Sequence, residues 1–275
     1  MRFTVLGATG FIGSHLAAHL RREGHECLTP GRDDPTAGGR PMGHVIYAIG
    51  VTADFRQRPL DTVRAHVCRL LDVLERGLFD SLVYLSSARV YGGAADGRED
   101  AAFRVNPQDP SDVYNLSKLM GEAACFATAR PEVRVVRLSN VYGGDWTSEN
   151  FLTDIIRAAV DAGEIRLRTS PDSSKDYVAI GDVVGLLPRI ALAGQRRLYN
   201  VASGTNTSNR GLLEALARLT GCRVTVEEGA PAVSFPPLAI DRVREEFGFA
   251  PASVLDSLAG LVAEYRERKG RHDSH

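Results

Sequence analysis

A tyrosine and a lysine four residues apart are the strongest chemical signal in this sequence. Tyr114 and Lys118 stand at positions i and i+4 of a helix predicted over residues 111–129, so the phenol and the ammonium share one helix face. Ionising a free tyrosine at pH 7 costs about 4 kcal/mol, because its pKa is about 10. An ammonium a few ångströms away favours the phenolate by roughly 3–4 kcal/mol at an effective dielectric constant near 20. The pair therefore predicts that Tyr114 exchanges a proton with a substrate hydroxyl group.

Ser87 is expected beside this pair. It follows an apolar run at residues 81–85, which predicts a buried strand with the serine at its C-terminal end. Ligands of open α/β sheets bind at that edge, and a hydroxyl there can hydrogen-bond the reacting oxygen. Ser87, Tyr114 and Lys118 are the predicted catalytic residues.

A glycine-rich turn opens the chain between a predicted strand at 3–6 and a predicted helix at 11–22. The first glycine permits a tight turn, the second lets a pyrophosphate approach the backbone, and the third lets helix and strand pack closely. The free N–H groups at the helix start would face the phosphates. The motif predicts a nicotinamide dinucleotide site that also contacts the catalytic Tyr114 and Lys118. The predicted cofactor-binding residues of the turn are Gly7, Thr9, Gly10, Phe11, Ile12 and Gly13.

The residues after the second predicted strand, at 26–29, bear on the choice of dinucleotide. Arg32 could pair with a 2′-phosphate, whereas Asp33 stands slightly late to hold a ribose 2′-hydroxyl. NADP(H) is therefore preferred, with NAD(H) as the alternative. An ordinary role for Arg32 as a loop cation also stays open.

Strand-like and helix-like segments alternate along most of the chain, which predicts a Rossmann-type α/β fold with helices on both faces of a parallel sheet. About thirteen residues, 31–43, separate the second strand from the next one at 44–49. A helical crossover and a strand need more chain, so the usual third strand is expected to be missing or reduced to a loop. We expect a dinucleotide-binding domain at 1–145 and a substrate-binding lobe at 146–275, with a strand at 197–202 that could return to the main sheet. The remaining predicted elements are helices at 61–76, 149–162, 181–193, 208–220 and 254–268 and strands at 133–138, 165–168 and 223–226.

Composition excludes several classes of function. The 275 residues carry 33 Lys+Arg and 34 Asp+Glu, a net charge of −1, which argues against a general nucleic-acid binder. No apolar run approaches the roughly 20 residues that span a bilayer. The four cysteines stand far apart in apolar stretches without metal-ligand spacing. We therefore expect buried thiols, no metal, no membrane partner and a cytoplasmic location.

Together these motifs resemble the extended short-chain dehydrogenase/reductases of the NAD-dependent epimerase/dehydratase family, which modify nucleotide sugars. The segments that carry the resemblance are 7–13, 84–92, Tyr114 with Lys118, 137–143, 175–178 and 199–204. The resemblance implies the catalytic roles given above. It also implies a homodimer built through the helices at 61–76 and 112–129. The residues to which it assigns contacts are Ala48, Ile49 and Gly50 for the cofactor, Asn140 for the diphosphate, and Thr52 and Lys175 for the substrate.

Departures from the family pattern narrow the reaction. Family dehydratases place an Asp-Glu pair directly after the catalytic hydroxyl residue, where this chain has Ala88 and Arg89. Alanine has no proton to exchange and arginine stays charged, so dehydration is disfavoured. Arg89 is then either a contact for a substrate anion or a charge at the strand end. His66 replaces a family asparagine and is expected to be a packed, hydrogen-bonded histidine.

We therefore expect an NAD(P)-dependent oxidoreductase that reduces a nucleotide-linked 4-keto sugar. A nucleotide-sugar 4-epimerase with tightly held NAD is the first alternative. A non-catalytic NAD(P)-sensing regulator is the second, although such proteins typically lose the Tyr/Lys pair that this chain keeps.

Overall fold

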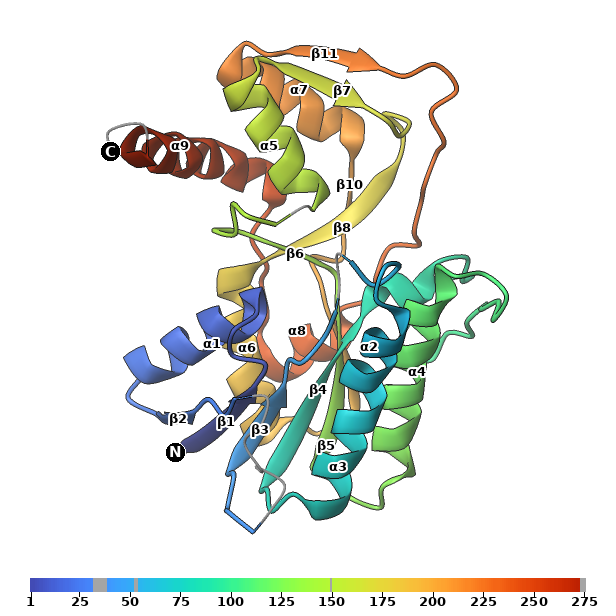
Figure 1. The fold of residues 1–275 in the computed structure, drawn as a ribbon, viewed down its shortest axis with the longest axis vertical. Coiled ribbons are helices and arrows are strands. Elements are labelled where there is room, and N and C mark those ends of the chain that lie inside the picture. The colour runs from blue at the N-terminus through green and yellow to red at the C-terminus, as the bar shows by residue number, and fades with distance from the viewer. Residues whose placement is uncertain (32–38, 52–53, 149, 273–275) are drawn as a thin grey trace.

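A six-stranded parallel sheet forms the centre of the computed structural model, which describes residues 1–31, 39–51, 54–148 and 150–272 (Figure 1). In spatial order the strands are β2 (Glu26–Leu28), β1 (Arg2–Leu6), β3 (His44–Tyr47), β4 (Ser81–Ser87), β5 (Val133–Leu138) and β9 (Leu198–Val201). The inner strands are buried on both faces, so their sequences read as nearly continuous apolar runs. The predicted α/β fold with a parallel sheet is confirmed.

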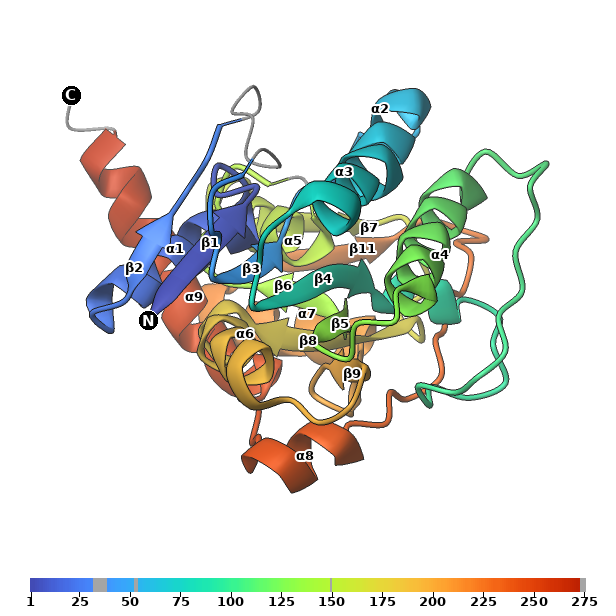
Figure 2. The ribbon, with the colours of Figure 1, turned by 90° about the horizontal axis from the view of Figure 1, so that it is seen from below.

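Helices cover both faces of this sheet (Figure 2). On one face, α1 (Phe11–Arg22) and α6 (Ile180–Ala193) pack on alternate strand residues such as Val5 and Val83. The other face is covered by α2 (Pro59–Val63), α3 (Arg69–Arg76) and α4 (Asp112–Ala127). The carboxyl ends of all six strands therefore lie at one edge of a three-layered body.

The segment predicted as a single helix at 61–76 is interrupted. Between α2 and α3 the chain forms one π-helical turn, Arg64–Cys68, with His66 buried at its centre. Such turns widen a helix locally and occur frequently at functional sites.

Residues 32–38, most of the connection after β2, lie outside the described residues, and the loss of the third strand stays a prediction. β2 pairs only with β1, and β3 pairs with the opposite side of β1. Within the described residues the sheet therefore ends at β2, where the usual dinucleotide-binding sheet has its third strand.

A second lobe sits above the carboxyl edge of the sheet (Figure 1). Its core lies between α5 (Phe151–Asp161), α7 (Asn209–Thr220) and α9 (Val254–His272), beside the paired strands β7 (Glu164–Leu167) and β11 (Arg223–Val226). A small sheet of β10 (Asn206–Ser208), β8 (Ser174–Ala179) and β6 (Asn140–Tyr142) belongs to the same end of the molecule. The chain returns to the main sheet through α6, β9 and α8 (Asp241–Phe247), so the two lobes interleave in sequence.

The thiols differ in burial. Cys125 and Cys222 are buried, but Cys68 is exposed and Cys27 is half-buried. The expectation of four buried thiols is wrong for these two. Cys27 packs against the core from the edge strand β2, which leaves it half-buried, and Cys68 faces solvent from the π-helical turn. None of the helices in the described ranges is long and apolar enough to cross a bilayer, and no three His, Cys, Asp or Glu side chains there gather to hold a metal ion.

Candidate active site

The carboxyl end of β4 brings together the three predicted catalytic residues. Ser87 ends the strand, and its hydroxyl accepts a hydrogen bond of 3.2 Å from the backbone N–H of Arg89. Tyr114 and Lys118 project from α4, which packs against β4, and both are only 5% exposed. Lys118 Nζ donates to the Leu85 carbonyl at 2.8 Å and lies 5.9 Å from the centre of the Tyr114 ring. The cluster has the composition and position of a proton-transfer site.

Burial dominates the electrostatics of this cluster. It raises the pKa of the Tyr114 phenol, against the opposing effects of a hydrogen bond with Ser87 and the positive charge of Arg89. It lowers the pKa of Lys118 to about 7, although the nearby Glu122 carboxylate acts in the opposite direction. In the protein without ligands, Lys118 therefore does not lower the pKa of Tyr114 as expected. Burial disfavours the charged forms of both groups more strongly than the attraction between phenolate and ammonium favours them. Further positive charge is needed to make the phenol acidic.

His66 links the catalytic helix to the chain after β3. Its side chain is fully buried, and burial followed by the charge of Lys118 lowers its pKa to about 2. The neutral ring accepts the Val51 N–H at Nε2 (3.4 Å), so Nδ1 carries the proton and donates to Ser117 Oγ at 2.8 Å. The predicted packed and hydrogen-bonded histidine is confirmed.

The glycine turn has the shape that a pyrophosphate requires. Gly7 has a φ of +90°, and a Cβ there would lie 2.7 Å from the Ala48 carbonyl oxygen, so both the backbone conformation and the space demand glycine. A Cβ at Gly13 would lie 2.2 Å from the Gly7 carbonyl oxygen, which shows how closely α1 approaches the strand. A Cβ at Gly10 would lie 3.5 Å from its nearest neighbour, the Gly7 carbonyl oxygen, which is an ordinary contact distance.

The start of α1 is free to bind an anion. Gly10 provides no side-chain cap, and the first turn contains no acidic residue. The first N–H groups of the helix therefore lack side-chain partners and attract negative charge. On the other side of the turn, a Cβ at Gly50 would lie 3.8 Å from Lys118 Nζ, so the Ala48–Gly50 segment joins the glycine turn to the catalytic cluster. The residues present fit a dinucleotide.

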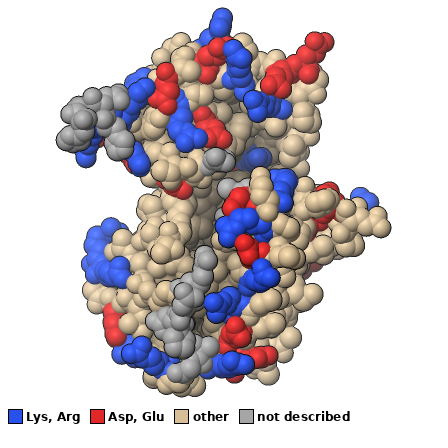
Figure 3. All heavy atoms as spheres, viewed as in Figure 1, with Lys and Arg blue, Asp and Glu red and all other residues tan. Residues whose placement is uncertain are grey.

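The residues predicted to contact substrate are only partly brought together. Arg32 and Thr52 lie outside the described residues. Arg89 lies beside the cluster, with its guanidinium carbon 5.9 Å from the centre of the Tyr114 ring. Lys175 lies on β8 in the second lobe, with its Nζ 5.6 Å from the centre of the Phe151 ring, and burial followed by the charge of Arg89 lowers its pKa. Figure 3 shows a hollow between the two lobes with basic side chains along its rim.

Asn140 also makes a hydrogen bond within the protein, and its predicted diphosphate contact stays a prediction. Its side-chain amide donates to the Asp176 carbonyl at 2.8 Å, which ties the start of β6 to β8. This hydrogen bond uses one of the two N–H donors of the amide, and the other is available for the predicted diphosphate contact.

Sequence reasoning missed Glu122 and Arg137 as parts of the site. The two form a buried ion pair of 2.6 Å beneath the cluster, and Ser86 Oγ donates to the same carboxylate. Glu122 is the carboxylate that opposes the loss of charge at Lys118. Its position four residues after Lys118, on the same helix face, is the sequence signal that could have revealed it.

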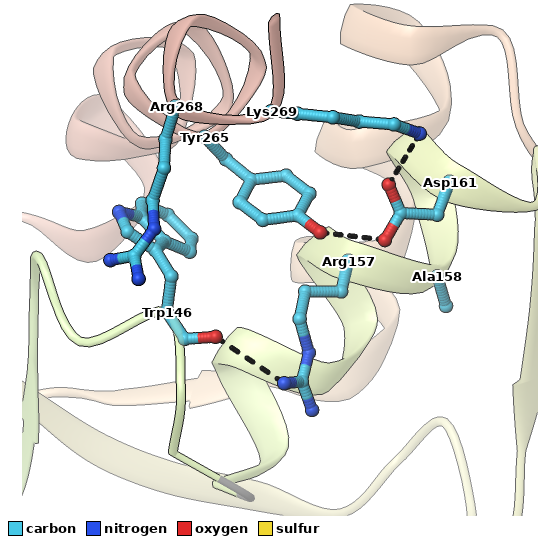
Figure 4. A pocket seen from close by; sticks show the side chains of 7 residues that line it. All are labelled: Trp146, Arg157, Ala158, Asp161, Tyr265, Arg268 and Lys269. Carbon is cyan, nitrogen blue, oxygen red and sulfur yellow. Dashed lines mark hydrogen bonds and ion pairs between the residues drawn. The ribbon is translucent and has the colours of Figure 1, made fainter. Parts of the chain in front are cut away.

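Another surface hollow lies on the second lobe, away from this cluster (Figure 4). It has a volume of about 500 Å³ and is lined by Trp146, Arg157, Ala158, Asp161, Tyr265, Arg268 and Lys269. Its polar groups largely pair with one another: Asp161 accepts from Tyr265 at 2.6 Å and from Lys269 at 2.8 Å. None of the predicted site residues lines it, and the cluster at β4 stays the candidate site.

Comparison with known proteins agrees with this geometry. Residues 3–202 match the model of the NAD dependent epimerase/dehydratase family. A dTDP-glucose 4,6-dehydratase of Streptomyces griseus is 29% identical over 211 residues, covering 73% of this chain and 63% of the dehydratase, so the chain spans less than two thirds of that relative's length. A dTDP-4-dehydrorhamnose reductase of Mycobacterium tuberculosis is 29% identical over 249 residues, covering 86% of this chain and 81% of the reductase.

A solved structure, MoeE5 in complex with UDP-glucose and NAD, superimposes with a TM-score of 0.81 at 22% identity, covering 98% of this chain and 99% of that one. This likeness shows the Rossmann-type fold. The family match extends from the first strand through the last strand of the main sheet and includes the glycine turn and the cluster of Ser87, Tyr114 and Lys118. The chain therefore belongs to the NAD-dependent epimerase/dehydratase family.

Proposed function

We propose that this protein reduces the keto group of a nucleotide-linked 4-keto sugar with a nicotinamide cofactor. The observation that carries the proposal is the convergence of Ser87, Tyr114 and Lys118 at the end of β4, next to a turn that fits a pyrophosphate. The similar reductase and dehydratase both act on dTDP-linked sugars, which supports a nucleotide sugar as the substrate class.

The side chains divide the proton chemistry between them. A bound nicotinamide would supply the hydride. The Ser87 hydroxyl orients and polarises the keto oxygen, and the Tyr114 phenol gives that oxygen its proton. Lys118, held on the Leu85 carbonyl, supplies charge next to the phenol. Elimination of water would need an acid and a base at positions 88 and 89, and the alanine and arginine there argue for simple reduction.

NADP(H) is the proposed preferred cofactor. The proposal rests on the sequence Gly31-Arg32-Asp33 after β2, where a cation can pair with a 2′-phosphate. The short connection after β2 also leaves a smaller adenosine pocket than a tightly held cofactor would use. Both features favour a cofactor that exchanges during turnover.

Turnover of the cofactor and its exchange from the protein, measured together, test the proposed reaction. The purified protein is mixed with NADPH or NADH and with UDP-, dTDP- and GDP-linked 4-keto sugars, and loss of reduced-nicotinamide absorbance is followed. We expect turnover with one of these sugars, faster with NADPH. Cofactor that co-purifies and does not exchange, together with interconversion of 4-epimers, would instead identify a 4-epimerase. Binding of NAD(P) without any turnover would identify a sensing role.

We also propose a cytoplasmic homodimer. Apolar side chains stand exposed on the helices expected to form its interface: Met120 is 58% exposed, Leu71 39% and Phe126 37%. Sedimentation equilibrium of the wild type and of Met120→Lys tests this, with a shift towards the monomer expected for the variant.

A further inference from the structure

Among the described residues, no carboxylate forms an ion pair with the guanidinium of Arg89. Of the buried side-chain polar atoms that lack a hydrogen-bond partner among the described residues, Arg89 Nε is the one that carries charge. Leaving a buried charged donor unpaired costs free energy, so the site is incomplete without an acceptor.

The groups that face Arg89 do not supply that acceptor. Asp109 and Asp112 raise the pKa of Arg89, but each carboxylate already accepts a hydrogen bond from a backbone N–H of the loop before α4. Arg56 adds a like charge, and so does Lys175 from across the hollow. Burial is the largest influence and lowers the pKa of Arg89. Arg56 is exposed, so solvent screens its charge, and an anion would chiefly stabilise the half-buried charge of Arg89.

The position of the guanidinium shows which part of a ligand it would meet. Its carbon lies 5.2 Å from the centre of the Phe55 ring and 5.9 Å from that of Tyr114, and the Arg89 backbone N–H holds the Ser87 hydroxyl. The two aromatic rings, 5.2 Å apart, fix its place beside the proton-transfer cluster. An anion bound here therefore belongs to the sugar that reacts and sits next to the reacting carbon.

We propose that the substrate sugar carries a carboxylate, as in a hexuronic acid, and that Arg89 binds it, with Lys175 adding positive charge from the second lobe. A guanidinium presents parallel N–H donors that match a flat carboxylate, whereas a neutral hydroxymethyl group would leave the charge unpaired. This inference rests on the proposed function, since it assigns the substituent of the sugar that the cluster reduces.

Binding measurements on the full-length protein loaded with NADP⁺ test this proposal. Isothermal titration calorimetry first identifies which of UDP, dTDP and GDP binds most tightly. The glucose and glucuronic acid forms of that nucleotide, a pair that differs only at C6, are then compared. We expect the glucuronic acid form to bind at least about tenfold more tightly, in keeping with a charge-assisted hydrogen-bonded pair.

Two variants locate the preference. Arg89→Met should bring the two sugars to within about twofold of each other while leaving the affinity for the free nucleoside diphosphate unchanged. Arg56→Met, which removes an exposed arginine from the same Phe55 ring, should keep the preference. NADP⁺ affinity and melting temperature report whether each variant folds. If Arg89→Met does not fold, Arg89→Gln takes its place in the comparison.

Three results would overturn the proposal, and they differ from failure of the proposed function. Equal binding of the two sugars by the wild type, which needs no variant, would refute the carboxylate. Equal weakening of the free nucleoside diphosphate by Arg89→Met would assign Arg89 to the diphosphate. If NADP⁺ binds but no nucleoside diphosphate does, the proposed function fails and this inference fails with it.

Discussion

Replacing Lys118 by methionine should make the protein more stable and inactive at the same time. The ammonium is 5% exposed, and burial lowers its pKa from the ordinary 10.5 to about 7. Between pH 7 and pH 10.5 the folded protein therefore holds fewer protons than the unfolded chain at this site, so the stability of the wild type rises with pH. Below pH 7 the full penalty of burying the ammonium is present.

The size of the effect follows from these two pKa values. The shift corresponds to a penalty of about 4–5 kcal/mol at pH 6 to 7, falling to about 2 kcal/mol at pH 9 and to nothing above pH 10.5. Methionine removes this penalty but leaves the Leu85 carbonyl without its donor, at a cost of about 1–3 kcal/mol. The net stabilisation expected for Lys118→Met at pH 7 is therefore about 1–3 kcal/mol.

The assay is urea denaturation of both proteins at pH 7 and pH 9, with unfolding free energies from linear extrapolation. The difference in unfolding free energy between Lys118→Met and the wild type should fall by about 2 kcal/mol from pH 7 to pH 9. The cost of the unpaired Leu85 carbonyl is the same at both pH values, so it does not affect this change. Lys269→Met is the control for removing a lysine, because that lysine pairs with Asp161 at the surface of α9 and its side chain is 40% exposed.

A difference between Lys118→Met and the wild type that does not change with pH would refute the argument. It would mean that Lys118 keeps an ordinary pKa in the folded protein, so that the carboxylate of Glu122 outweighs burial. Loss of stability at every pH would show that the hydrogen bond to Leu85 matters more than the charge.

Three further predictions concern the neighbourhood of the cluster. Gly13→Ala should abolish NADP⁺ binding and lower the melting temperature, because its Cβ would lie 2.2 Å from a carbonyl oxygen, whereas Gly10→Ala should fold normally; equal melting temperatures for the two would contradict the geometry. Glu122→Gln should cost about 3–5 kcal/mol in urea denaturation, since it leaves the Arg137 charge buried without its counter-ion, and a loss below about 1 kcal/mol would show that the pair contributes little. The imidazole of His66, whose pKa is lowered to about 2, should show no titration between pH 4 and pH 8 by NMR, and a midpoint near 6 would place it in contact with water.

The positions of the glycine turn and of Tyr114 and Lys118 were predictable because each depends on local spacing. Gly7, Gly10 and Gly13 act within one strand–turn–helix unit, and Tyr114 with Lys118 act within one turn of α4. The position of Ser87 followed from the rule that parallel strands present their carboxyl ends to ligands.

Features that depend on distant packing escaped sequence reasoning. The acidity expected for Tyr114 considered only its neighbour Lys118, whereas the burial that raises its pKa comes from elements far along the chain. The short strands β6, β8 and β10 carry too few residues to show an alternating pattern, and they exist because they pair with one another. The buried partnership of Glu122 with Arg137 joins α4 to β5, which no local spacing reveals.

The most direct test of the account is single-turnover hydride transfer by Tyr114→Phe. The phenylalanine keeps the ring packed against Phe55 and His66 and removes only the hydroxyl that gives the proton. We predict an unchanged dissociation constant for NADPH and a rate lower by about 10²–10⁴-fold. A rate within about threefold of the wild type, with NADPH still bound, would show that the proton comes from another group.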